Sequence, residues 1–102
     1  MINEKDYVSY LVTLKNSIYK ILPLYEEGSV TLANYVLSVS FELSHVSKVT
    51  DKYDGAWLIK NLAVLKGLEE EVKKPNNQPF IKSKVLGILN TIDKQIQKAK
   101  EV

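Results

Sequence analysis

The sequence predicts an all-α fold, an antiparallel up-down four-helix bundle made by a single domain that spans residues 1–102. Three observations support this prediction. Apolar residues recur at alternating spacings of four and three in four separate segments, which is the pattern of a helix with one buried side. The stretches between these segments are short and contain the prolines and glycines typical of turns. Apolar residues make up 45% of the chain and charged residues 25%, which is typical of a folded globular protein.

The first predicted helix runs from about Glu4 to Leu22. Its apolar stripe consists of Tyr7, Leu11, Leu14, Ile18 and Ile21. Pro23 is expected to end or kink this helix, because proline has no backbone N–H to donate. Gly28 is the expected turn residue of the connector that follows.

The second segment allows two interpretations. From Leu37 to Ser44 apolar and polar residues alternate, as in a half-buried strand. A helical stripe covers a longer stretch, and its members are Leu32, Val36, Val39, Leu43 and Val46. We therefore predict a helix over residues 32–46, with Thr31 as its N-cap. The alternative is an α+β fold in which residues 17–46 form a β-hairpin packed on helices, which would place Pro23 inside a strand.

The third predicted helix runs from about Gly55 to Lys74 and the fourth from about Pro79 to Lys100. Asp54 is a favourable N-cap for the third helix, and Tyr53 with Leu58 fits a hydrophobic staple. Short connectors favour antiparallel neighbours, which gives the up-down order of the bundle.

The second helix carries apolar residues on two sides. At about 100° per residue, Val30, Leu37 and Phe41 fall opposite the stripe that starts at Leu32. A helix in a four-helix bundle normally keeps one side in water, so these residues are candidates for an interface with a protein partner or a second copy. A second candidate patch on the first helix contains Val8, Val12 and Tyr19. In the alternative interpretation the two patches pack on each other at a broad seam inside the fold.

The composition argues against several kinds of chemistry. The 14 basic residues are all lysines, and the lack of arginine argues against specific nucleic-acid recognition. With no cysteine and a single histidine, we expect no metal site, no catalytic residues, no cofactor and no small-molecule substrate. No apolar run reaches the roughly 20 residues of a membrane span. The N-terminus lacks the features of a signal peptide, so we expect a cytoplasmic protein.

The stretch HVSKVT, which begins at His45, resembles the phosphorylation site of histidine phosphotransfer domains. These domains are four-helix bundles with a lysine three residues after the phosphorylated histidine, and Lys48 has that spacing. Val49 departs from the glycine of the family pattern, and Ser47 departs from its apolar residue. The resemblance implies phosphotransfer by His45, although a side chain at position 49 crowds the site where the family has glycine.

The function that we expect is that of a small non-enzymatic protein-binding module, acting as an inhibitor, an immunity-type protein or an adaptor through an apolar helix face. Small arginine-poor helical proteins of this size include bacteriocin immunity proteins and phage-encoded inhibitors, an analogy of size and fold class only. The alternatives are a structural homo-oligomer and a histidine phosphotransfer domain that uses His45.

Overall fold

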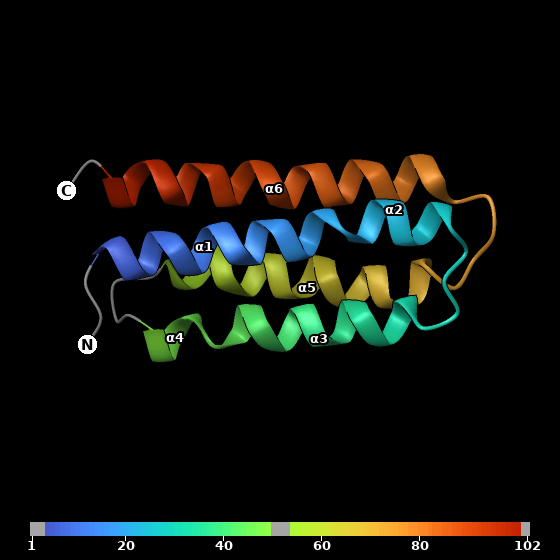
Figure 1. Cartoon of the computed structure of the whole chain (residues 1–102), viewed down its shortest axis with the longest axis horizontal. Coiled ribbons are helices and arrows are strands. Elements are labelled where there is room, and N and C mark those ends of the chain that lie inside the picture. Colours follow the sequence, from blue (N-terminus) through green and yellow to red (C-terminus); the bar gives the residue numbers. More distant parts are fainter. Residues whose placement is uncertain (1–3, 50–53, 101–102) are drawn as a thin grey trace.

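The computed structural model is an elongated bundle of helices that measures 43 × 21 × 20 Å. The structure describes residues 4–49 and 54–100 (Figure 1). The helices are α1 (Glu4–Tyr19), α2 (Ile21–Glu26), α3 (Leu32–Ser44), α4 (Val46–Val49), α5 (Gly55–Glu71) and α6 (Gln78–Lys100). Because α2 continues α1 and α4 continues α3, the chain makes four long, antiparallel passes. This arrangement confirms the predicted all-α bundle.

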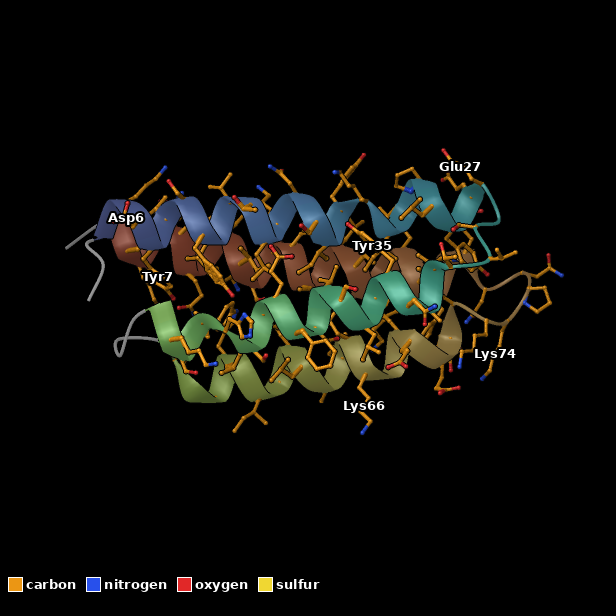
Figure 2. The ribbon with its side chains drawn as sticks, turned by 60° about the horizontal axis from the view of Figure 1, so that its bottom comes forward. Asp6, Tyr7, Glu27, Tyr35, Lys66 and Lys74 are labelled. Atoms are coloured by element: carbon orange, nitrogen blue, oxygen red, sulfur yellow. The ribbon has the colours of Figure 1, made fainter. Side chains whose placement is uncertain are left out.

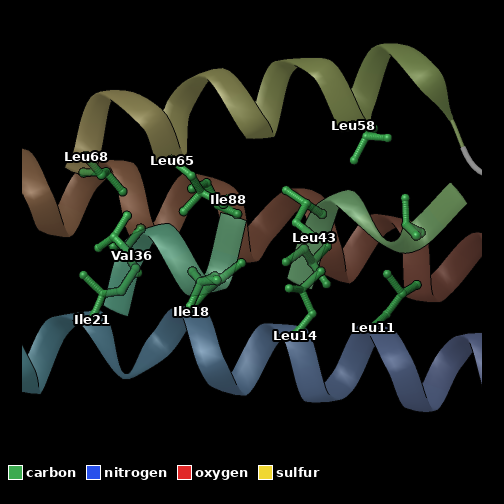
Figure 3. Close-up of a cluster of buried hydrophobic side chains, with 14 of the residues drawn as sticks. Leu11, Leu14, Ile18, Ile21, Val36, Leu43, Leu58, Leu65, Leu68 and Ile88 are labelled. Carbon is green, nitrogen blue, oxygen red and sulfur yellow. The ribbon is translucent and has the colours of Figure 1, made fainter. Parts of the chain in front are cut away.

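The four passes associate as two pairs. The most extensive packing joins α1 to α6 and α3 to α5, with smaller seams between α1 and α3 and between α5 and α6. The pairs enclose one core of buried apolar side chains, part of which is shown in Figure 3. Fully buried side chains in it include Leu11, Leu14, Ile18, Val36, Leu43, Leu65, Leu68, Ile81, Ile88 and Ile92. The core therefore contains the four apolar stripes read from the sequence.

The alternative of a β-hairpin is wrong, because residues 17–46 contain only helices and turns, and the predicted helix is confirmed. Val36, Val39 and Leu43 on α3 are buried, whereas Leu37 and Phe41 are exposed. The side chains thus follow the helical period of 3.6 residues and not the alternation of a strand.

Several helix ends differ from the predicted boundaries. The first predicted helix breaks after Tyr19, and α2 contains Pro23 and extends to Glu26. Proline at position 23 cannot donate the hydrogen bond that the Tyr19 carbonyl would accept in a continuous helix, so the break lies four residues before it. The second predicted helix ends at Ser44, short of Val46, which begins α4.

Two of the predicted caps can be compared with the structure. Asp54 caps α5, since its carboxylate accepts hydrogen bonds from the backbone N–H groups of Ala56 (3.0 Å) and Trp57 (3.2 Å). Thr31 precedes α3 but its side chain makes no capping bond, because its hydroxyl pairs with that of Ser29 at 3.2 Å. Gly28 has a φ of 70°, which confirms it as the turn residue before α3. Tyr53 of the predicted staple lies outside the described residues.

A small polar cluster joins α5 to α6 inside the otherwise apolar core. Asn61 is 2% exposed, and its amide donates a hydrogen bond to the Thr91 hydroxyl at 3.0 Å. The indole N–H of Trp57 donates to the same oxygen at 3.2 Å. The Thr91 hydroxyl in turn donates to the Ile88 carbonyl at 2.8 Å. One hydroxyl therefore satisfies two buried donors and fixes how α5 and α6 face each other.

We expect Thr91→Val to destabilise the protein by about 1–3 kcal/mol, because Asn61 and Trp57 each lose a buried acceptor while the side-chain volume is kept. Thr91→Ser, which retains the hydroxyl, is the matched control and should cost clearly less. Urea unfolding followed by circular dichroism measures both. Equal stability of Thr91→Val and the wild-type protein would show that the cluster contributes nothing.

Candidate protein-binding surface

Two tyrosines at the seam between α1 and α3 fix the direction in which α3 faces. The Tyr10 hydroxyl on α1 donates a hydrogen bond to the Glu42 carbonyl on α3. In the reverse direction, the Tyr35 hydroxyl on α3 donates to the Ser17 carbonyl on α1 at 2.6 Å. Tyr35 lies between the two helices in Figure 2. Because the bonds are directional and two helical turns apart on α3, together they oppose rotation of α3 about its axis.

Burial also changes the acidity of these tyrosines. Desolvation, with a smaller contribution from the Glu42 carboxylate, raises the pKa of Tyr10 from 10.0 to about 12. The same two causes raise the pKa of Tyr35, against the lowering effect of its hydrogen bond to Ser17. Both phenols therefore stay protonated, and able to donate, well above neutral pH.

Leu37 and Phe41 lie on the side of α3 that faces away from α1. They are one helical turn apart, and they are 37% and 61% exposed. Val30, the third predicted member of this patch, is 99% exposed but precedes the helix, which starts at Leu32. Its predicted place on the helical side was therefore wrong. Val30 instead lines an open cleft of about 620 Å³ at the end of the bundle, together with Ala33 and Lys73.

The outward side of α3 is almost free of charge. Glu42 is the only charged residue of α3, and its position is on the side of the helix that faces α1. Three serines donate their hydroxyl hydrogens within the helix: Ser38 to the Asn34 carbonyl, Ser40 to Val36 and Ser44 to Phe41, at 3.2, 3.1 and 2.7 Å. A serine with a satisfied donor is cheaper to bury than one that must give up a bond to water. We define Leu37, Ser38, Phe41 and Ser44 as the α3 face.

The second candidate patch lies on a different side of the molecule. Lys15 of α1 forms an ion pair with Asp93 of α6 at 2.7 Å, and helical spacing puts Val8, Val12 and Tyr19 on this side of α1. Val12 and Tyr19 are 42% and 52% exposed, whereas Val8 is half-buried against the core. The broad seam between the two patches is therefore absent, since Tyr10 and Tyr35 occupy that position.

Sequence reasoning missed several exposed apolar side chains. Leu86 of α6 is seven residues before Asp93, and so lies on the same side of its helix as the Lys15 ion pair. Ile59 of α5 and Phe80 of α6 are also exposed. Each stands off the buried stripe of its helix, which is the signal that could have identified it.

His45 is exposed and follows the last residue of α3, where the helix breaks before α4. Its carbonyl accepts the Lys48 backbone N–H at 2.9 Å. Within the ranges 4–49 and 54–100, no three histidine, cysteine, aspartate or glutamate residues cluster as metal ligands. In the same ranges, no helix combines the length and apolar character needed to cross a membrane.

No family model, curated protein or solved structure significantly matches the chain.

The raised pKa of Tyr10 predicts a loss of stability in alkali. An unfolded tyrosine ionises near pH 10, whereas Tyr10 in the folded protein keeps its proton to about pH 12. The folded state therefore binds more protons in this range, so its stability is intact below pH 10 and falls as the pH rises towards 12.

We expect Tyr10→Phe to lower stability at neutral pH by about 0.5–1.5 kcal/mol, the net value of one hydrogen bond. It should also flatten the decline of stability above pH 10. Urea unfolding at several alkaline pH values measures both effects, with Tyr19→Phe as the control because Tyr19 is exposed. An unchanged alkaline decline in Tyr10→Phe would contradict the assignment.

Proposed function

We propose that the protein is a non-enzymatic protein-binding module of the cytoplasm, which acts as an inhibitor, immunity-type protein or adaptor through the α3 face. The observation that carries this proposal is the exposure of Phe41 and Leu37 on a helix side without charged groups. Interface cores are depleted in charge and enriched in aromatic residues. The α3 face has both properties.

The energetics of the α3 face also favour association. Full burial of a phenylalanine or leucine side chain contributes roughly 1.5–3 kcal/mol, and Phe41 is 61% exposed before any partner binds. The hydroxyl hydrogens of Ser38 and Ser44 are already donated to backbone carbonyls, so covering these serines leaves no donor without a partner. Phe41 is thus the expected anchor of the interface, and the serines around it allow close approach.

A structural homo-oligomer is the second candidate, and it uses the same surface. In a two-fold dimer each patch meets its own copy, so a charged patch would repel itself. The lack of charged groups on the α3 face removes this obstacle. Phosphotransfer by His45 remains a third proposal, and acid-labile phosphate that is lost in His45→Gln would support it.

Phe41→Glu tests the α3 face. We expect this variant to keep its helical circular dichroism spectrum, since Phe41 is outside the core, and to lose any association of the wild-type protein. Val12→Glu is the matched control, because it adds the same charge at an exposed position on a different side of the bundle. Light scattering at two concentrations reports self-association. Affinity capture on the immobilised protein, followed by purification of the proteins that bind, reports a heterologous partner.

The outcomes separate the candidates. A wild-type dimer that becomes monomeric in Phe41→Glu, but not in Val12→Glu, supports the homo-oligomer. A wild-type monomer that captures one protein, and loses it only in Phe41→Glu, supports the binding module. Association that is lost in Val12→Glu and kept in Phe41→Glu would move the interface to α1. Unfolding of Phe41→Glu would place Phe41 in the core and overturn the proposal.

A further inference from the structure

A second surface of different character lies between α5 and α6. A groove of about 240 Å³ runs along this seam, where the two helices pack less extensively than within the main pairs. The apolar side chains that line the groove are Val64 of α5, which is half-buried, Leu68 of α5, which is buried, and Phe80 of α6, which is 43% exposed. The groove thus exposes apolar atoms of Val64 and Phe80 above the buried side chain of Leu68.

Small residues keep this groove open. Ala63 and Gly67, four residues apart on α5, line it and are both exposed. A Cβ atom added to Gly67 would meet nothing within 4 Å. The backbone of α5 is therefore accessible here, and the side chains of another segment could approach it closely.

Lysines without an acidic partner stand beside the groove, whereas the two acids at its other border, Glu70 and Glu71 of α5, are paired with Lys73 and Lys74. Helix α6 carries five lysines and only one acidic residue, Asp93, which is paired with Lys15. The Lys84 ammonium lies 5.4 Å from the centre of the Phe80 ring and so stands at the edge of the groove. Lys60 is three residues after Trp57 and four before Val64, so helical spacing puts it on the side of α5 that faces α6. Neither Lys60 nor Lys84 forms an ion pair with any residue in the described part of the chain.

Among the described residues, Glu71 is the acid that lines the groove, and its carboxylate already has two hydrogen-bond donors. The Glu71 carboxylate accepts hydrogen bonds from Lys74 at 3.1 Å and from the Asn77 amide at 2.6 Å. These two bonds, in that order, lower the pKa of Glu71 below its usual value. Glu71, the last residue of α5, is therefore engaged by residues that follow the helix, and it forms no ion pair with Lys60 or Lys84.

We propose that the groove between α5 and α6 binds an acidic, amphipathic helical segment of a partner protein. Bulky apolar side chains of that segment would enter the groove over Gly67, and its carboxylates would pair with Lys84 and Lys60. Charge complementarity identifies this occupant, because a second copy placed symmetrically would bring lysines against lysines. The exposed aromatic ring and the open apolar groove favour a peptide over a polyanion. This binding is independent of the α3 face.

Binding of a synthetic peptide tests the proposal. The probe is a fluorescein-labelled helical peptide with leucines on one side and glutamates on the flanks, and its control replaces the glutamates with lysines. Fluorescence anisotropy gives the dissociation constant at low and high salt. We expect the acidic peptide to bind the wild-type protein, and the basic peptide to bind at least about tenfold more weakly. Added salt should weaken binding of the acidic peptide.

Two variants and a control locate the binding site. Gly67→Leu fills the groove and raises helix propensity, so it should stay folded and weaken binding about tenfold or more. Lys84→Glu reverses one charge at the edge and should weaken binding to a similar extent. Lys66→Glu is the matched charge reversal, because Lys66 also lies on α5 but outside the groove. Lys66 points away from the bundle (Figure 2), so this change should alter binding less than threefold.

Several results would overturn the proposal. One is equal affinity for the acidic and basic peptides. Another is an unchanged affinity for the acidic peptide in both Gly67→Leu and Lys84→Glu. A third is a loss of affinity in Lys66→Glu as large as that in Lys84→Glu, which would indicate general attraction to a basic protein. Binding to RNA or to anionic vesicles that excludes the peptide, and that Gly67→Leu leaves intact, would assign the lysines to a polyanion. If Gly67→Leu loses its helical spectrum, the peptide affinities of Lys84→Glu and Lys66→Glu decide: the proposal requires that only Lys84→Glu binds the acidic peptide more weakly.

Discussion

The rotation of α3 about its own axis decides which of its side chains are exposed at the surface of the bundle. The apolar core restricts this rotation only loosely, because hydrophobic burial is non-directional. The hydrogen bonds from Tyr10 to the Glu42 carbonyl and from Tyr35 to the Ser17 carbonyl are directional, and they therefore hold α3 in one rotation relative to α1. The Thr91 cluster has the same role between α5 and α6. In both seams, a few hydrogen bonds fix the faces that the core alone would leave adjustable.

Helix identity could be read from the sequence because burial repeats along each helix. The stripe from Leu32 to Leu43 fixed α3 as a helix, although Leu37 and Phe41 fit a strand equally well over a shorter stretch. Helix breaks were harder to place. Pro23 ends α1 indirectly, because it lacks the N–H that the carbonyl of Tyr19, four residues earlier, would accept. No sequence signal marked the break at His45. Such details depend on packing, and local propensity is too weak to fix them.

The candidate surface could be predicted only in part. Helical phase correctly placed Leu37 and Phe41 away from the core, because phase depends on one helix alone. It could not say which neighbour lies beside each face. The side of α1 that carries Val12 was assigned to α3 as one alternative, and the pairing of Lys15 with Asp93 places that side next to α6. The groove was missed for the same reason, since Val64, Gly67 and Phe80 come together only when α5 and α6 are paired.

The distribution of charge gives the two surfaces different physical tasks. The α3 face has no charged group among its residues, so under the proposed function it would gain its binding energy from burial and could meet a neutral partner or its own copy. The groove between α5 and α6 has Lys84 at its edge, and the proposed attraction of an acidic segment would raise association rates more than affinity. Because α5 packs on α3 and on α6, one helix supports both surfaces. A chain that used both would hold two partners at a fixed geometry, as an adaptor requires, whereas an inhibitor needs only one.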